Sequence, residues 1–299
     1  MGKGIDGRDA AVRSLWSCGV MRNVYLCGMD VRPKKALGQH FLMDASIAQR
    51  IVGALCDGEE ADACGVDGRL RVLEVGAGTG VLTEILLGRE EVDLWAVEID
   101  GESVGYLLRR FPVLRGRLVQ DDFLTLDLSA VFEGRFLVVG NFPYHISSQI
   151  LFKVLEHRDR IPMVVGMLQK EVAERIAAGP GSKTYGILSV LLQTWYDIEY
   201  LFTVSEHVFL PPPKVKSAVV RLIRNGRVEV LCPEPLFKRV VKATFNQRRK
   251  TIRNSIRQVT GKVVLLDHPL LALRPEQLSV AQFIELTNFV ESRISAISH

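Results

Sequence analysis

Short apolar runs alternate with segments of helical period between residues 45 and 178, and this alternation restricts the fold more than any other feature of the chain. Strands that alternate with helices build a parallel sheet covered by helices on both faces. We therefore predict a doubly wound, Rossmann-like α/β domain. Strands are expected at Leu70–Val75, Leu94–Ile99, Arg117–Gln120, Phe136–Gly140 and Met163–Leu168, and helices at Ala45–Leu55, Val81–Leu87, Glu102–Arg110, Ser147–His157 and Lys170–Ala178.

The pattern changes after Arg224, where Asn225-Gly226 is typical of a turn and the following segments have only helical period. We predict an α/β domain over residues 31–224 and a small α-helical domain over 225–299. The last elements of the first domain are a helix and an antiparallel hairpin that closes the sheet edge, expected at Gly186–Trp195, Asp197–Val204 and Ser217–Ile223.

Residues 1–30 differ from the rest, because they show no clear periodicity. They contain no apolar core of a signal peptide, and Asp6 and Asp9 are unusual in a transit peptide. We expect a disordered extension, or an upstream start codon with Met21 or Met29 as the internal alternative.

The composition excludes several classes of protein. No apolar run reaches the ~18 residues of a membrane helix, so no membrane association is expected. The five cysteines are odd in number and form no C-x-x-C pair, which argues against a disulfide framework or a zinc site. We expect a cytoplasmic protein, a monomer, with no metal.

Positive charge is concentrated in one part of the chain. Residues 225–262 hold ten Lys or Arg and two Glu, a net charge of +8, while the whole chain carries only +4. Such asymmetry favours a region that faces nucleic acid over a solvated helix face. If the segment is helical, Arg249, Arg253 and Arg257 share one face, and Ile252 and Ile256 can dock the other side on the protein.

A glycine loop follows the first strand of the sheet, at Gly76, Gly78 and Gly80. In the dinucleotide fingerprint the third glycine comes three residues after the second. Here that position is Val81, so NAD and FAD are disfavoured. Glu74 lies at the end of the strand before the loop, which suits a zwitterionic ligand that carries an ammonium group.

Carboxylates follow the next two strands as well. Glu98 ends one strand, where it can accept hydrogen bonds from both ribose hydroxyls, and Asp122 follows another, where it can accept from an adenine amine. Each alone could be an ordinary surface residue. Together with Glu74 they favour S-adenosyl-L-methionine as the cofactor.

The fourth strand ends in Asn141-Phe142-Pro143-Tyr144, the most informative stretch of the chain. An adenine amine is a poor nucleophile, and the Asn141 side-chain carbonyl and the Phe142 main-chain carbonyl can accept hydrogen bonds from its two hydrogens. Pro143 biases Phe142 to extended geometry. Tyr144 offers a flat face on which an extruded base can stack. The alternative is a simple proline turn after a buried strand.

At this point the chain resembles the small-subunit ribosomal RNA adenine N6,N6-dimethyltransferases, relatives of the erythromycin-resistance methyltransferases. The resemblance covers roughly residues 32–292. It rests on the glycine loop, the tetrapeptide and four further stretches: Lys35–Leu42, Leu168–Val172, Phe209–Ala218 and Phe245–Asn254. The last two are not shared by methyltransferases at large. The resemblance implies a class I methyltransferase sheet followed by a helical RNA-binding domain.

The resemblance also implies how the cofactor is held. His40 and Leu42 would lie against it from an N-terminal lid, and Gly76 with its loop would hold the methionine portion. Glu98 would bind the ribose and Asp122 the adenine. The family often has Asn where this chain has His40, which still offers a polar contact.

On the substrate side, Asn141 would lie between the cofactor and the target. Phe209 would face Tyr144 across the flipped adenine and complete an aromatic sandwich. Phe142 stands where the family often has Leu, a harmless change if its main-chain carbonyl does the work. The residues expected to contact RNA are Lys214, Lys216, Arg248, Arg249, Lys250, Arg253 and Arg257.

The implied activity is dimethylation of two adjacent adenines in a hairpin loop near the 3′ end of small-subunit ribosomal RNA, on a precursor of the small ribosomal subunit. One alternative is an adenine methylase of DNA or of large-subunit RNA. Another is a non-catalytic ribosome-assembly factor on the same scaffold, against which the presence of Glu98 and Asn141 argues.

Overall fold

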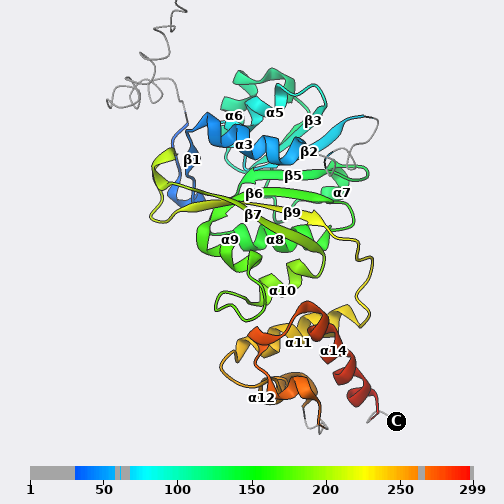
Figure 1. Ribbon diagram of the computed structural model, residues 1–299. Helices are drawn as coiled ribbons and strands as arrows, with labels where there is room; N and C mark the ends of the chain where they lie inside the picture. The colour runs from blue at the N-terminus through cyan, green and yellow to red at the C-terminus, as the bar shows by residue number, and fades with distance from the viewer. Residues whose placement is uncertain (1–30, 58–60, 62–67, 262–266, 297–299) are drawn as a thin grey trace, which may run out of the picture.

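The computed structural model describes residues 31–57, 61, 68–261 and 267–296 (Figure 1). The expectations for residues 1–30, the alternative start positions included, lie outside the described residues. A central sheet of seven strands has the order β4-β3-β2-β5-β6-β9-β7. The strands span Leu70–Val75 (β2), Val92–Glu98 (β3), Leu118–Gln120 (β4), Leu137–Asn141 (β5), Met163–Gln169 (β6), Tyr196–Val204 (β7) and Ser217–Arg224 (β9).

The predicted doubly wound α/β fold is confirmed. Strands β4 to β6 are parallel, and the chain winds outward from β2 in both directions. The predicted hairpin is also present, because β9 pairs antiparallel with both β6 and β7 and leaves β7 at the edge. The reversal of strand order between β2 and β5 opens a crevice at the carboxyl ends of the strands, where sheets of this type bind ligands.

Alternate residues of the buried strands point to opposite faces of the sheet, and each face has its own apolar core. Val72, Ala96 and Val139 pack with the helices on one face, while Leu73, Val97 and Val138 pack with those on the other. Figure 1 shows α3, α5 and α6 on the first side of the sheet and α8, α9 and α10 on the second. These helices span Ala45–Cys56 (α3), Val81–Leu87 (α5), Gly101–Arg110 (α6), Ser147–Glu156 (α8), Lys170–Ala177 (α9) and Ile187–Gln193 (α10), and a short helix lies at Leu128–Val131 (α7).

A two-stranded sheet that the sequence did not predict joins the N-terminal lid, residues 34–42, to the segment before β9. Strand β1 (Phe41–Leu42) pairs antiparallel with β8 (Phe209–Leu210). Each strand has only two residues, too few for a recognisable alternation in the sequence. This pairing brings the lid over the carboxyl edge of the main sheet.

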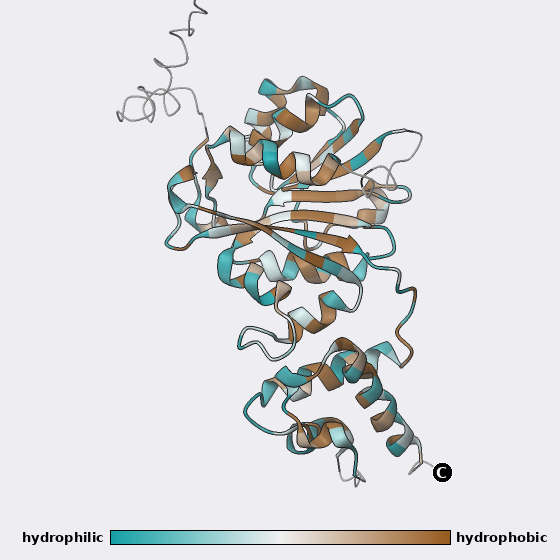
Figure 2. Cartoon of the chain, in the orientation of Figure 1, coloured by the Kyte–Doolittle hydropathy of each residue, from teal (hydrophilic) through white to brown (hydrophobic). Residues whose placement is uncertain are grey.

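The C-terminal region is helical, as predicted, and lies beneath α10 (Figure 1). Its helices are α11 (Glu234–Asn246), α12 (Ile252–Ser255), α13 (Arg257–Thr260) and α14 (Val280–Ser295). The apolar core on this side of the sheet continues into α11 and α14, and the rings of Tyr185 and Phe245 meet across the junction at 6.0 Å between centroids. Figure 2 shows apolar residues gathered along the strands and polar ones on the outer helix surfaces.

One conditional prediction for this region is wrong. Arg249, Arg253 and Arg257 do not share a helix face, because α11 ends at Asn246 and the chain turns before α12. Ile252 and Ile256 are nonetheless completely buried, as the docking argument required.

Candidate active site

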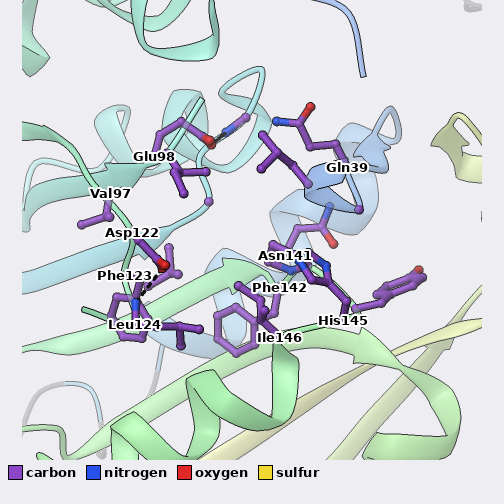
Figure 3. A pocket seen from close by; sticks show the side chains of 18 of the residues that line it. Gln39, Val97, Glu98, Asp122, Phe123, Leu124, Asn141, Phe142, His145 and Ile146 are labelled. Atoms are coloured by element: carbon purple, nitrogen blue, oxygen red, sulfur yellow. Dashed lines mark hydrogen bonds between the residues drawn. The ribbon is translucent and has the colours of Figure 1, made fainter. Parts of the chain in front are cut away.

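A cleft of about 910 Å³, which includes the open space at its mouth, lies at the carboxyl ends of β2 to β5 (Figure 3). The sheet contributes the glycine loop, the end of β3, the loop after β4 and the segment after β5, while the lid closes one side. The residues that line it include Gln39, His40, Gly76, Gly78, Glu98, Ile99, Asp122, Leu124, Asn141, Phe142, Pro143, Tyr144 and His145.

The glycine loop turns sharply enough to bring its main chain to the cleft. Gly76 and Gly78 have φ of +74° and +55°, values that L side chains rarely adopt. A Cβ atom at Gly78 would stand 3.2 Å from the ring of Phe41 in the lid. The loop therefore offers bare main chain to a ligand, with the lid close above it.

Glu98 is buried and fixed by main-chain donors. Its Oε2 accepts from Gly78 N at 2.8 Å and its Oε1 from Asp100 N at 2.9 Å. Burial raises the pKa of Glu98, and these two hydrogen bonds oppose the shift. A carboxylate has about four acceptor positions, so Glu98 keeps acceptor capacity for a ligand hydroxyl beyond these main-chain bonds.

Asp122 also lines the cleft, as predicted, and its Oδ1 accepts from Leu124 N at 2.9 Å. The next residues of this loop are tied down by Lys153 of α8, which is buried. Its Nζ donates to the main-chain carbonyls of Phe123 and Leu126, both at 2.5 Å. Burial lowers the pKa of this ammonium group.

Glu74 does not meet the expectation that it lies against a ligand. It is only 1% exposed and is not among the lining residues; instead Thr83 of α5 donates to its Oε2 at 2.6 Å. Burial raises the pKa of Glu74 to about 8. Glu74 therefore joins β2 to α5 behind the glycine loop.

Asn141 is oriented by the lid. Its Nδ2 donates to the main-chain carbonyl of His40 at 2.8 Å. Because a carbonyl only accepts, this bond assigns the amide nitrogen to the lid and leaves Oδ1 as the side-chain acceptor for a ligand in the cleft.

Phe142 is almost fully buried, and two glycines make room for its ring. A Cβ at Gly140 or Gly166 would stand 2.8 Å or 2.4 Å from ring atoms of Phe142. The phenylalanine ring thus fits into the core, and Phe142 N donates to Met167 O at 2.9 Å.

The expected sandwich of Tyr144 and Phe209 is not found. Phe209 is 2% exposed, because β8 pairs it with Leu42 and its ring packs into the core beside the lid. Leu42, expected against the cofactor, is buried in the same core and does not line the cleft. The ring that lies on Tyr144 is that of His40, with 5.3 Å between centroids and 26° between planes.

The lid is anchored by contacts that sequence reasoning missed. Lys34 Nζ lies 2.5 Å from Asp100 Oδ1, just after β3, and Lys34 N donates to Gln39 Oε1 at 2.8 Å. The ring of His145 covers Gly38, where a Cβ would stand 2.6 Å from His145 Nδ1. Asp100 directly follows a predicted strand, but only the fold shows its partner.

The basic residues fall into two groups. Lys214, Lys216, Arg249, Lys250 and Arg257 are exposed, as is Arg253, which pairs with Asp267 at 2.7 Å. Arg248 lies at the junction instead: its guanidinium donates to Ser182 O at 3.1 Å and lies 3.9 Å from Glu276. The structure thus gives Arg248 a role in holding the C-terminal helices.

Within the described residues, no group of three or more His, Cys, Asp or Glu could hold a metal ion. In the same part of the chain, no helix combines the length and the apolar character that crossing a membrane requires.

The sheet order, the glycine loop with bare main chain and the two carboxylates at successive strand ends define a class I S-adenosylmethionine-dependent methyltransferase. The residues present fit that cofactor: the loop can approach its methionine end, Glu98 its ribose and Asp122 its adenine amine. Ile99, which is 49% exposed, adds an apolar surface beside them.

Comparison with known proteins narrows this class. The family model described as ribosomal RNA adenine dimethylase matches residues 31–291. The ribosomal RNA small subunit methyltransferase A of Parabacteroides distasonis is 62% identical over 262 residues, 86% of this chain and 93% of that protein. The protein of the same name from Bacteroides thetaiotaomicron is 57% identical over 88% of this chain and 96% of its own length.

Two solved structures share the fold. A dimethyladenosine transferase from Plasmodium falciparum has a TM-score of 0.69 at 23% identity and covers 85% of this chain and 98% of its own. The 23S rRNA methyltransferase ErmE has a TM-score of 0.59 at 26% identity, with 83% and 99% covered. The chain belongs to the ribosomal RNA adenine dimethylase family.

Proposed function

We propose that this enzyme transfers methyl groups from S-adenosyl-L-methionine to the N6 amines of two adjacent adenines near the 3′ end of small-subunit ribosomal RNA, two groups to each. The observation that best supports this chemistry is the orientation of the Asn141 side chain. Its Nδ2 donates to the lid, which leaves its Oδ1 as an acceptor for the substrate. The names of the curated relatives support the small subunit as the source of the RNA.

The cofactor is proposed to lie along the carboxyl ends of β2 to β4. Main-chain groups of Gly76 and Gly78 approach the methionine end, Glu98 accepts from the ribose hydroxyls, and Asp122 accepts from the adenine amine. His40 contributes its main chain from the lid. The bound cofactor supplies an electrophilic methyl group on a sulfonium that leaves as a neutral thioether.

The chain's own residues would act by positioning. In the first transfer, Asn141 Oδ1 and the Phe142 main-chain carbonyl accept from the two N6 hydrogens and direct the nitrogen lone pair at the methyl group. In the second transfer, one of the two accepts from the single hydrogen that remains. Pro143 keeps this carbonyl in place. Tyr144 offers a ring face, and burial raises the pKa of its phenol, against a lowering by the Ser217 hydroxyl. A neutral phenol suits a stacking surface. Because the sulfonium is an excellent leaving group, no strong general base is required, and the methylated nitrogen releases its proton to water.

RNA is proposed to lie across the exposed basic residues. Lys214 and Lys216 are exposed on the segment between Pro211 and Ser217, whose ends bond to the cleft residues His40 and Tyr144. Four further exposed basic residues lie in the segment from the end of α11 to α13: Arg249, Lys250, Arg253 and Arg257. Phosphate contacts of this kind position a substrate without reading its sequence. We propose that the enzyme acts as a cytoplasmic monomer on a precursor of the small ribosomal subunit.

Methylation of purified ribosomal subunits tests this proposal. Small subunits that lack dimethyladenine, incubated with the protein and labelled S-adenosylmethionine, should yield N6,N6-dimethyladenosine after digestion to nucleosides. Large subunits and duplex DNA serve as parallel substrates. Label in either of these and none in small subunits would favour a large-subunit or DNA methylase, and no label in any would favour a non-catalytic assembly factor.

A further inference from the structure

Two rings meet at the mouth of the cleft, and both are tethered to one segment of chain. His40 Nδ1 lies 2.7 Å from Pro211 O and therefore carries the hydrogen of that bond. The Tyr144 hydroxyl lies 2.5 Å from Ser217 Oγ. Residues 211–217, here named the tether loop, thus hold the two stacked rings, one at each end.

The two ends of the tether loop differ in how firmly they are held. Ser217 begins the eight-residue strand β9, which is paired on both sides, and Lys170 N donates to Lys216 O at 3.0 Å. Pro211 follows only the two-residue strand β8. A force on the loop would therefore move the His40 end more readily than the Tyr144 end.

The spacing of the rings excludes a base from between them. Their centroids are 5.3 Å apart, whereas a base that stacks on both would need two contacts of ~3.5–4 Å, or about 7–8 Å in all. One face of the Tyr144 ring is covered by His40, so an adenine that stacks on this face must displace the His40 ring.

We propose that the His40 ring gates the target-base site: it rests on Tyr144, and it withdraws when RNA phosphates bind Lys214 and Lys216 and displace Pro211. This inference rests on the proposed function, since the group that replaces the ring is an adenine of RNA. Both lysines are exposed on the tether loop, within five residues of Pro211. With this gate, the target adenine can enter its site only after the RNA phosphates have bound the two lysines.

Removal of the gate ring should favour capture of the base. His40→Asn keeps a side-chain donor for Pro211 and the main-chain carbonyl that Asn141 requires, but has no ring. An aromatic pair contributes ~0.5–1.5 kcal/mol, so binding of the target base should improve by about 2- to 12-fold. His40→Phe keeps a ring over Tyr144 and is the matched control, with no such gain expected.

The experiment measures binding of a short RNA hairpin with the target adenines, and of the same hairpin with abasic sites at those positions. Full-length protein is used with S-adenosylhomocysteine, and affinity is read from the fluorescence anisotropy of an end label. His40→Asn should bind the intact hairpin more tightly and the abasic hairpin as the wild type does. Lys214→Ala with Lys216→Ala should weaken intact binding less in the His40→Asn background than in the wild type.

Other outcomes separate the gate from the proposed function. If wild type distinguishes the two hairpins but His40→Asn gains nothing, or binds the intact one more weakly, the ring is not a gate and the inference is wrong. The inference is also wrong if Lys214→Ala with Lys216→Ala weakens binding of the intact hairpin equally in the wild-type and the His40→Asn backgrounds. If no variant distinguishes intact from abasic RNA, the protein has no target-base site, and the proposed function fails together with the gate.

Discussion

The side-chain amide of Asn141 donates to the main-chain carbonyl of His40 at 2.8 Å, across 101 positions of sequence. This bond connects the end of β5 to the N-terminal lid and leaves Oδ1 of the amide as the free acceptor. The side chain proposed to bind the substrate is thus held by a segment whose own strand has two residues.

Replacement of Asn141 by Ala should lower turnover by ~10²-fold or more, because a preorganised acceptor for the N6 hydrogens is lost. Cofactor affinity should change much less, since the glycine loop and Glu98 remain. Single-turnover methylation and calorimetric titration with S-adenosylmethionine measure the two effects. Turnover close to that of the wild type would rule out the assigned role.

Replacement of Lys153 by Met should weaken cofactor binding, on the order of 10-fold. The variant loses the two hydrogen bonds to main-chain carbonyls that hold the loop after β4. Hydrogen bonds to a charged group contribute ~1.5–3 kcal/mol each, and only part of this energy is expected to appear as a loss of cofactor affinity. The control is Lys170→Met, because the Lys170 ammonium group pairs with Glu174 on the surface of α9. Calorimetric titration with S-adenosylmethionine compares the cofactor affinities of the two variants. Equal affinities would show that this loop needs no such support.

The free energy of unfolding should fall as the pH rises towards 8, because Glu74 is protonated in the folded protein. Its pKa rises from an ordinary value of 4.5 to about 8 on folding, so between those values the folded protein holds a proton that the unfolded chain releases. Glu74→Gln has no proton to lose and should flatten the dependence of Tm on pH in this window, with a higher Tm than the wild type near pH 8.

The control for this experiment is Glu84→Gln, on the exposed side of α5, which should follow the wild-type profile. A Glu74→Gln profile parallel to that of the wild type would mean that Glu74 is ionised in the folded protein at neutral pH.

Substitutions in the two groups of basic residues should have different effects on RNA binding and on stability, which a salt titration of binding and a measurement of Tm can distinguish. Arg249→Glu with Lys250→Glu should weaken binding to small subunits and lower the slope of log K against log salt by roughly one to two, with Tm unchanged. Arg248→Ala should instead lower Tm, because it removes the contacts with Ser182 and Glu276 at the junction. An unaltered slope in the double variant would assign these charges to the fold.

Periodic segments of the sequence predicted the main sheet well. Leu70–Val75 and Val81–Leu87 have the predicted bounds, and the other predicted strands and helices of residues 45–224 differ by two residues or fewer at each end. Such elements are long enough for burial to leave a repeating pattern. Glu98, Asp122 and Asn141 could be placed in one cleft because the ends of parallel strands meet at the same edge.

Features made by contacts between distant residues could not be predicted. Phe209 appeared as a partner of Tyr144, but its pairing with Leu42 turns it into the core, and His40 takes the place on Tyr144. The chain turn after Asn246 likewise separates arginines whose spacing suggested a common face. These outcomes depend on packing across the fold, and no local pattern encodes them.

The most direct test of the account is the modification state of native small-subunit RNA. Mass spectrometry of its 3′ region from the source organism, with and without this gene, should show two adjacent dimethylated adenines in the parent strain. Deletion should leave both adenines unmodified, and a copy with Asn141→Ala should not restore them. Dimethyladenine that persists at both positions after deletion would contradict the account.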